Sequence, residues 1–471
     1  MKNDRSKNKS NNKVSRRKFI NTLGATTAGL ILAPYIKSDS IFAYGYDNTS
    51  SYISKVALAG ADNYERAFVR QRVEHLFEEL GGLDDVVQPG NKVALKINLV
   101  GGSGSAYSNM HQGRSITETM WTHPEVLRAV GELLIDYGIN QHDIYIVEAL
   151  WDDESYNDFG YLDVQNSLGV NFIDLDKKEP YDDFIEMPVG SDKFHYDSFM
   201  CNRILDEIDV YISIAKMKQH YSAGVTHSIK NQVGIVPLQF YTRHFDTSRR
   251  AELHNGGGNE SVHLPRSICD LFFARPVNLA VVDGIMNAVG GEGVWNPTFV
   301  PADYNVLLAG KDPVATDSIA SYLMGNDPEA DELQLPNGNY ADNYLKMLST
   351  KGAGTNKMAE IQTVGDGADM VTSVPSDHPD SVPETIVLSE NFPNPFNSST
   401  SIKFYLPEQQ HVSMKLYSVT GREVDTLIDG VVPAGHHVVQ WTAHHNIASG
   451  VYFYVMVAGN FRETRKMVYQ K

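Results

Sequence analysis

The amino-acid sequence predicts an α/β fold with a largely parallel sheet and flanking helices, followed by a small all-β sandwich. Between about residues 53 and 365, apolar strand-like runs alternate with amphipathic helical stretches, which is typical of a parallel sheet covered by helices. After residue 388, apolar and polar residues alternate in short segments separated by Gly- and Pro-containing turns. The 471 residues, 42% of them hydrophobic, allow two or three domains with buried cores.

The N-terminus has the pattern of an export signal. Ser15-Arg16-Arg17-Lys18-Phe19-Ile20 leads into a moderately apolar run over 19–34, which is too short for a membrane-spanning helix. This pattern resembles a twin-arginine signal peptide, with an expected cleavage after Ala43. The resemblance implies that the twin-arginine translocase exports the protein and that residues 1–43 are removed as a signal peptide. We expect no transmembrane span after that removal. The alternative is a disordered basic tail that runs into a short helix.

Five apolar runs in the 53–365 segment end on polar or charged residues. They are KVALKIN (92–98), DIYIVE (143–148), VYISIAK (210–216), VNLAVVD (277–283) and YNVLLAGKD (304–312). We interpret these runs as strands. In an open parallel sheet, ligands bind in the crevice outside the carboxyl ends of the strands, so we expect a site there.

Three amphipathic stretches between these runs predict helices. They cover residues 64–80, 124–137 and 314–324. Thr122 or His123 can cap the second helix, because Pro124 suits a first helical position, where a missing N–H costs nothing. Asp312 precedes Pro313 in the same way at the third helix.

The predicted site combines cations and carboxylates at the strand ends. Lys216, Lys218 and His220 follow one strand at a spacing of two, so if this segment is extended all three point one way, with the two ammonium groups roughly 7 Å apart. Their repulsion requires a counter-anion if they are buried. We predict ligand binding by Asn98, Lys216, Lys218, His220, Lys230 and Asn231, and catalysis by Lys96, Asp283 and Glu292. A solvated basic loop is the alternative.

Two further features concern cofactors. Cys201 and Cys269 are the only cysteines, so one chain cannot ligate an ordinary four-cysteine iron–sulfur cluster, and we expect none; the two are either a disulfide or free buried thiols. The cofactor is otherwise unknown. Mg²⁺ or Ca²⁺ is a candidate, with Asp283, Asp312 and Asp317 as metal ligands, although each can instead bond a turn or a helix end. The loop 101–114 can bring N–H groups to an anion or cover the site as a lid.

The C-terminal part has a composition boundary and then several motifs. Residues 366–387 are rich in Asp, Ser, Pro and Gly and predict a flexible linker. Four motifs follow: NFPNPFN (391–397), VTGREV (419–424), PAGHHVVQW (433–441) and ASGVYFYVMVAGNFRETRKM (448–467). Residues 388–471 therefore resemble the immunoglobulin-like C-terminal sorting domain of the type IX secretion system. This implies the type IX apparatus as a partner and passage through the periplasm to the cell surface or medium. The alternative is an adhesion or spacer module.

The central segments carry a second resemblance. VALKINLV (93–100), THPEVLRAV (122–130), SIKNQVG (228–234), VDGI (282–285), GGEG (290–293) and LLAGKDPVATDSIASYLMG (307–325) resemble the domain of unknown function 362 family. That resemblance implies no particular activity. We predict an exported enzyme acting on a small anionic substrate, a carboxylate or a phosphate compound. The alternatives are a non-catalytic surface ligand-binding or redox-accessory protein, and a structural carrier.

Charge excludes one class of partner. The formal net charge is −18, and nine Lys/Arg and two Asp lie in residues 1–43, so the rest of the chain carries −25. Such an acidic body repels phosphate backbones, and we expect no nucleic-acid partner.

Overall fold

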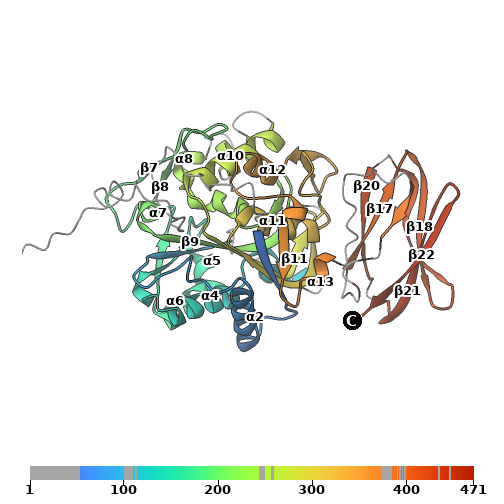
Figure 1. Cartoon of the computed structure of the whole chain (residues 1–471), viewed down its shortest axis with the longest axis horizontal. Helices are drawn as coiled ribbons and strands as arrows, with labels where there is room; N and C mark the ends of the chain where they lie inside the picture. Colours follow the sequence, from blue (N-terminus) through green and yellow to red (C-terminus); the bar gives the residue numbers. More distant parts are fainter. Residues whose placement is uncertain are drawn as a thin grey trace, which may run out of the picture. The chain divides into compact units, whose positions relative to one another are not determined.

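The computed structural model in Figure 1 describes most of the chain. The described residues are 54–99, 110–111, 114–242, 250–255, 259–296, 298–372, 385–389, 391, 394, 396, 399–432, 435–444 and 447–470. The predicted signal peptide 1–43, most of the 101–114 loop and linker residues 373–384 lie outside them. Within the described ranges, every helix is too short or too polar to span a bilayer.

One large mixed sheet organises the α/β part. Its strand order is β15-β1-β12-β11-β9-β2-β5-β6, with β10 paired to β9. The strands are β1 (Ser54–Gly60), β2 (Val93–Ile97), β5 (Ile144–Glu148), β6 (Asn171–Asp174), β9 (Val210–His220), β10 (Gly224–Thr226), β11 (Leu279–Val289), β12 (Val300–Gly310) and β15 (Ile361–Val364). The pairs β2–β5, β2–β9, β5–β6, β9–β11 and β1–β15 are parallel. The predicted, largely parallel α/β fold is confirmed.

Helices cover both faces of this sheet (Figure 1). On one face α2 (Arg66–Glu79), α4 (Pro124–Asp136) and α6 (Tyr161–Leu168) close an apolar core with the strands. On the other face α10 (Glu260–Ala274), α11 (Pro313–Leu323) and α12 (Tyr344–Thr350) close a second core. Because strand side chains alternate between the faces, each strand contributes to both cores.

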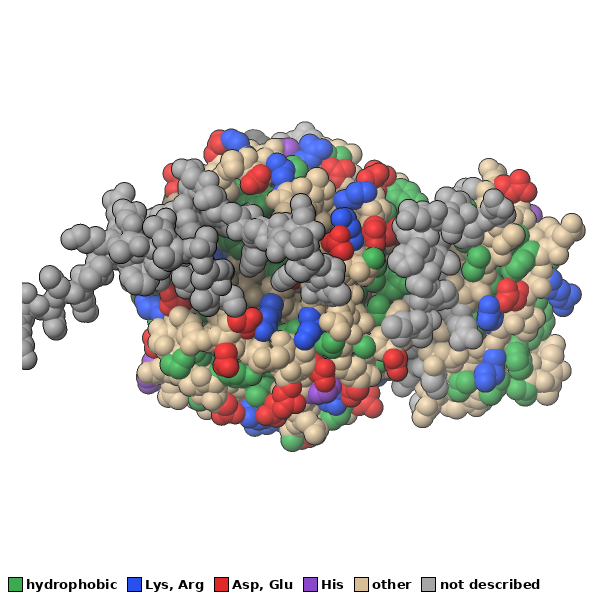
Figure 2. Space-filling model, in the orientation of Figure 1, with side chains coloured by type: hydrophobic (Ala, Val, Ile, Leu, Met, Phe, Trp, Pro, Cys, Tyr) green, Lys and Arg blue, Asp and Glu red, His purple; other side chains and the backbone are tan. Residues whose placement is uncertain are grey.

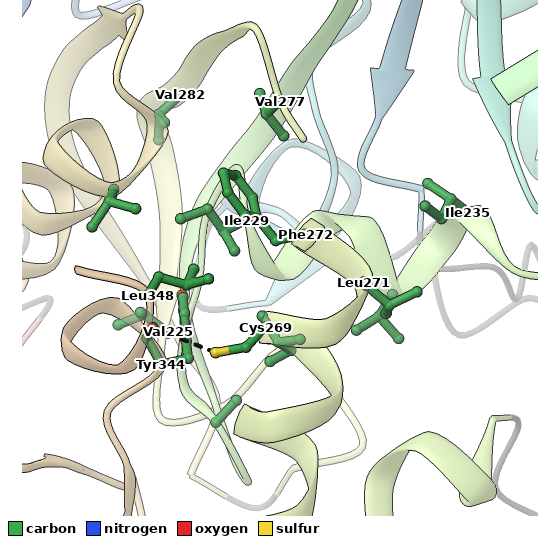
Figure 3. Close-up of a cluster of buried hydrophobic side chains, with 14 of the residues drawn as sticks. Val225, Ile229, Ile235, Cys269, Leu271, Phe272, Val277, Val282, Tyr344 and Leu348 are labelled. Atoms are coloured by element: carbon green, nitrogen blue, oxygen red, sulfur yellow. Dashed lines mark hydrogen bonds between the residues drawn. The ribbon is translucent and has the colours of Figure 1, made fainter. Parts of the chain in front are cut away.

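The second core contains a cysteine (Figure 3). Cys269 on α10 lies among Phe272, Tyr344 and Leu348, with its Sγ 3.6 Å from the Tyr344 carbonyl oxygen. Cys201 is also buried, and both are free thiols. Of the two alternatives for these cysteines, the structure has the free thiols.

The predicted helix caps are confirmed. His123 caps α4 by accepting the Glu125 N–H at Nδ1, and Pro124 is the first helical residue. Asp312 caps α11 by accepting the Ala315 N–H at 3.0 Å.

Shorter elements fill the connections. They are β3 (Met110–His111), β4 (Arg114–Ser115), α3 (Ile116–Met120), η1 (Gln141–Asp143), α5 (Asp153–Asp158), β7 (Ile185–Pro188), β8 (Ser198–Cys201), α7 (Ile204–Glu207), η2 (Lys230–Ile235), α8 (Leu238–Tyr241), α9 (Ala251–Asn255), β13 (Glu332–Gln334), β14 (Tyr340–Asp342), η3 (Met358–Glu360) and α13 (Asp369–Thr372). Of these, α3 and η2 bear on the site, because they lie near the carboxyl ends of β9 and β2.

Strand β12 corrects one expectation. It is antiparallel to both neighbours, β1 and β11, and its Leu307 is opposite Asp283 while its Gly310 is opposite Ala280. The prediction that all five carboxyl ends share one edge is therefore wrong for this strand, and Asp312 lies at the opposite edge from Asp283. The physical reason is the short connection after β11, which closes a hairpin where a parallel pairing would need a crossover.

The C-terminal part is all-β. One sheet has the order β16 (Val387–Leu388), β17 (Ser399–Leu406), β20 (Gly435–Thr442). The other has the order β19 (Glu423–Val432), β18 (Gln410–Ser418), β21 (Gly450–Ala458), β22 (Phe461–Tyr469). Val412, Met414 and Leu416 are fully buried in a separate core, as their alternation predicts.

Candidate functional site

Lys216 and Asp283 form a buried ion pair near the carboxyl edge of the large sheet. The two residues are register partners on β9 and β11, and Lys216 Nζ lies 2.9 Å from Asp283 Oδ2 with both side chains fully buried. The Tyr64 hydroxyl accepts from Lys216 Nζ at 2.8 Å and donates to Asp283 Oδ1 at 2.8 Å. Burial lowers the pKa of Lys216, and the Asp283 charge opposes that shift. The charge of Lys216 is thus balanced within the protein.

His123 joins this pair from the loop before α4. Its backbone N–H donates to Asp283 Oδ2 at 3.0 Å, and its ring stacks on Tyr64 with 3.7 Å between centroids. Burial lowers the pKa of His123 to about 4, so the ring is neutral at pH 7. Because Nδ1 accepts the Glu125 N–H, the ring hydrogen is on Nε2.

A second buried ion pair joins Lys96 to Glu148. Lys96 Nζ donates to Glu148 Oε2 at 2.8 Å, to the Ile97 carbonyl at 2.7 Å and to Asn231 Oδ1 at 3.2 Å. Three acceptors satisfy the three protons of an ammonium group. Burial lowers the pKa of Lys96 and raises that of Glu148, and each charge opposes the other's shift. As a base, Lys96 would first have to lose one of these protons.

The two ion pairs lie on opposite faces of the sheet. The strand neighbours of Lys96, Leu95 and Ile97, pack in the α2–α4 core. Lys96 therefore points to the other face, which it shares with Ala94 of the α10–α12 core. Lys216 instead shares a face with Ile212 and Ile214, which pack in the α2–α4 core. The predicted residues therefore surround the strand ends from both faces.

Lys218 differs from both of these lysines. Its side chain is fully buried, yet its Nζ donates only to main-chain carbonyl oxygens, that of Met120 at 2.5 Å and that of Glu292 at 3.2 Å. No carboxylate of the described residues lies within ion-pair distance of it. Burial and then the positive field of Lys230 lower the pKa of Lys218 well below its usual value.

Three further ionisable residues lie close enough to Lys218 or to one another to shift their pKa values: Lys230, His220 and Glu292. Lys230 is partly buried, no described group accepts from its Nζ, and burial lowers its pKa to about 8. His220 is buried, and burial together with Lys230 holds its pKa well below the usual value. Glu292 accepts from the Tyr221 N–H at 3.0 Å and from the Trp295 indole at 2.9 Å. Burial opposes its ionisation, but His220, these two donors and Lys230 outweigh burial and lower its pKa to about 2.

The two asparagines lie beside Lys96. Asn98 Nδ2 donates to Asn231 Oδ1 at 3.1 Å, and Asn231 Nδ2 donates to Ser213 Oγ at 3.1 Å. Gly234 on η2 covers this cluster closely, since a Cβ at Gly234 would lie 2.5 Å from Glu148 Oε1 and 2.7 Å from Lys96 Nζ.

The three predicted metal ligands do not come together. Asp312 accepts from Ser54 Oγ and from two backbone N–H groups, at the opposite sheet edge from Asp283. Asp317 accepts from the Ser228 N–H and hydroxyl and the Ile229 N–H. Each is fully engaged in capping or in fixing a turn. Among the described residues, no three His, Cys, Asp or Glu side chains are grouped to hold a metal ion.

An open cleft of about 500 Å³ lies elsewhere on the domain. Its lining residues are Glu329, Lys346, Ser349, Thr350, Gly354, Asn356, Lys357 and Glu360. Gly354 approaches the carboxylate of Asp312, which places the cleft near the opposite sheet edge. None of the predicted site residues lines it.

The sequence did not indicate Tyr64 or His123 as site residues. Tyr64 precedes α2, and no motif marks it. His123 was noted only as a cap. Because Asp283 and Tyr64 are 219 positions apart in the chain, only the tertiary fold brings them together.

Comparison with known proteins finds two families that match separate parts of the chain. Residues 390–470 match the secretion system C-terminal sorting domain, which indicates export to the cell surface or secretion. Thylakoid-associated protein sll1697 of Synechocystis sp. is 24% identical over 283 residues, which cover 59% of this chain and 76% of that protein. Residues 93–322, which contain both buried ion pairs, Lys218 and Lys230, match the family described as a domain of unknown function, DUF362.

Proposed function

We propose that the α/β domain, residues 53–365, is an enzyme that acts outside the cytoplasm on a small anionic substrate, a carboxylate or a phosphate compound. The sorting domain supports delivery to the cell surface by the type IX apparatus. Entry into the periplasm through the twin-arginine translocase, on the sequence pattern at Arg16 and Arg17, is part of the same proposal.

The observation that carries the proposal is the contrast among four lysines. Lys96 and Lys216 each have a buried carboxylate partner. Lys218 is equally buried but has only carbonyl oxygens, and its neighbour Lys230 has no described acceptor. A buried ammonium without a direct ion-pair partner is costly, and a bound anion would supply one. A carboxylate or a phosphate fits, because either accepts several hydrogen bonds from ammonium groups.

Three candidate groups for proton transfer lie near the carboxyl ends of these strands. Asp283 is positioned by Lys216, Tyr64 and the His123 N–H, and is a candidate acid or base. Glu292 is held ionised by its donors and also presents its carbonyl to Lys218. Lys96 supports Glu148 and the amide network and, as a base, would need to release a proton to that network.

The surface of the domain is consistent with a local anion site. Figure 2 shows Asp/Glu and Lys/Arg side chains interspersed over the described part of the visible face, without a broad basic area. Because the chain is acidic overall, attraction of an anion has to come from cations close to the site.

Binding and turnover can be tested separately on the full chain. Calorimetric titration with citrate and with inorganic phosphate should show binding to the wild type. We expect Lys218→Met, which keeps the unbranched stem and removes the charge, to lose about tenfold or more in affinity, as for a charged hydrogen bond of 1.5–3 kcal/mol. The control is Lys92→Met, since Lys92 is partly exposed at the start of β2, where it pairs with Glu207.

Incubation with a mixture of small organic acids and phosphate esters, followed by mass spectrometry, then tests catalysis. A product that forms with the wild type and not with Lys218→Met supports an enzyme. Binding without any product supports the non-catalytic alternative. Equal anion affinity in Lys218→Met and the wild type would refute the site.

A further inference from the structure

Asn98 presents an unpaired hydrogen-bond acceptor beside the proposed anion site. The side chain is 8% exposed, and its Oδ1 is buried without a donor among the described residues. Its Nδ2, in contrast, donates to Asn231 Oδ1 at 3.1 Å. A buried acceptor left without a donor is unfavourable, and such a group in a native protein calls for an explanation.

The orientation of the Asn98 amide follows from its neighbours. Lys96 Nζ donates to Asn231 Oδ1, so that atom must be the oxygen. Asn231 Nδ2 then donates to Ser213 Oγ, whose own hydrogen goes to the Ser228 carbonyl at 2.9 Å. If the Asn98 amide were reversed, two amide oxygens would face each other at the Asn231 contact. The unpaired oxygen of Asn98 is therefore imposed by the whole network.

Asn98 contacts residues that neighbour both of the lysines without a direct carboxylate partner. The Asn98 N–H donates to Thr122 Oγ1 at 2.9 Å, and the Thr122 N–H donates to the Asn98 carbonyl at 3.1 Å. Met120, two residues before Thr122, accepts from Lys218 Nζ at its carbonyl. Its side chain contacts Asn231, which directly follows Lys230. Met120 and Thr122 are at most about 7 Å apart along the chain, so Asn98 and Lys218 contact the same short segment at the end of α3.

We propose that the bound anion also carries a hydroxyl group, and that this hydroxyl donates to Asn98 Oδ1. The ligand class is then a hydroxycarboxylate or a hydroxyalkyl phosphate. This inference rests on the proposed function, because it assumes that Lys218 and Lys230 bind the charged end. A site with a buried polar group discriminates strongly against an analogue that leaves this group unpaired.

Matched ligand pairs on the full chain test the inference. The pairs are malate with succinate, and 2-hydroxyethyl phosphate with ethyl phosphate, which differ in the hydroxyl and not in the anionic group. In the wild type we expect the hydroxyl-bearing member to bind roughly 5- to 150-fold more tightly, the range for leaving one buried polar group unpaired. In Asn98→Leu this ratio should fall to about one while succinate binding is retained. A purely structural role of Asn98 would weaken both members equally and leave the ratio unchanged.

The outcomes separate this inference from the proposed function. Equal binding of both members, lost in Lys218→Met, refutes the hydroxyl contact and leaves the anion site intact. A ratio that persists in Asn98→Leu also refutes it, since another group then reads the hydroxyl. Absence of binding by all four compounds refutes both proposals. If Asn98→Leu does not fold, the ratio in the wild type alone still decides against the inference when it is close to one.

Discussion

Replacing Glu148 by glutamine tests how the fold holds a charged lysine inside it. The substitution keeps the shape of the side chain and a carbonyl oxygen for Lys96 Nζ and for the Leu99 N–H, which now donate to Glu148 Oε2 at 2.8 and 3.0 Å. It removes the only carboxylate that pairs with Lys96 among the described residues. Breaking a buried ion pair by removing one charge costs about 3–5 kcal/mol. Because both hydrogen bonds can persist, we expect about 3 kcal/mol less stability at pH 7.

The pH dependence of this loss follows from Lys96. Burial already lowers the pKa of Lys96, and the Glu148 charge opposes that shift. Without the charge, the pKa of Lys96 in the folded protein falls further below the value of about 10.4 in the unfolded chain. Between these two values the unfolded chain binds more protons, so the free energy of unfolding rises with pH by up to about 1.4 kcal/mol per unit. The deficit of Glu148→Gln should therefore shrink toward pH 10.

Urea denaturation of the full chain from pH 6 to pH 10 measures both effects. Hydrogen exchange of the β2 and β5 amides separates the α/β domain from the sandwich. The matched control is Glu207→Gln, which removes the carboxylate from an exposed pair with Lys92 and should cost less than about 1 kcal/mol. A deficit of Glu148→Gln as small as that of the control, or one that does not change with pH, would contradict this account of the pair.

Three further outcomes are expected. Gly234→Ala should lower the free energy of unfolding by about 1–3 kcal/mol, because the new Cβ would lie 2.5 Å from the nearest carboxylate oxygen. The control, Gly60→Ala, has nothing within 4 Å of its Cβ and should cost less than about 1 kcal/mol. Urea denaturation compares the two variants. The pKa of His123 is about 4 in the folded protein against 6.5 in the unfolded chain, so its contribution to stability is lost as the pH falls from about 6.5 to 4. His123→Phe should remove that part of the pH dependence when the melting temperature is measured over a pH series. Cys201 and Cys269 are buried and free, and burial raises the pKa of both thiols, so a thiol reagent should modify neither in the native protein and both after denaturation.

The sequence was sufficient for the architecture and for the ends of β2 and β5, whereas β9 and β11 continue to His220 and Val289, beyond the predicted ends at Lys216 and Asp283. Apolar runs located β2, β5, β9 and β11, and parallel pairing then placed Lys96, Glu148, Lys216 and Asp283 near one edge. The direction of β12 could not be read from its composition, because a buried antiparallel strand is as apolar as a parallel one. Asp312 was misplaced for that reason alone.

Spacing within a strand was also informative only up to a point. The interval of two correctly predicted that Lys216 and Lys218 leave β9 on the same face. It could not show that one lysine meets a carboxylate and the other only carbonyl oxygens, since these partners come from β11, α3 and the loop after β11. Tyr64 shows the same limit, because its contact with Asp283 depends on a residue far along the chain.

The four lysines therefore fall into two groups that differ in how their burial is compensated. Lys96 and Lys216 have carboxylate partners and further acceptors, so their burial is compatible with a purely structural role. Burial and then Lys230 lower the pKa of Lys218, and burial lowers that of Lys230, while the Glu292 charge opposes both shifts from beyond ion-pair distance. Folding alone gives no reason to bury a cation in that state, and apolar side chains of similar length would cost less. Local rules are broken in this way mainly at functional sites, so this pair, which has no direct carboxylate partner among the described residues, is the better guide to where this protein binds its ligand.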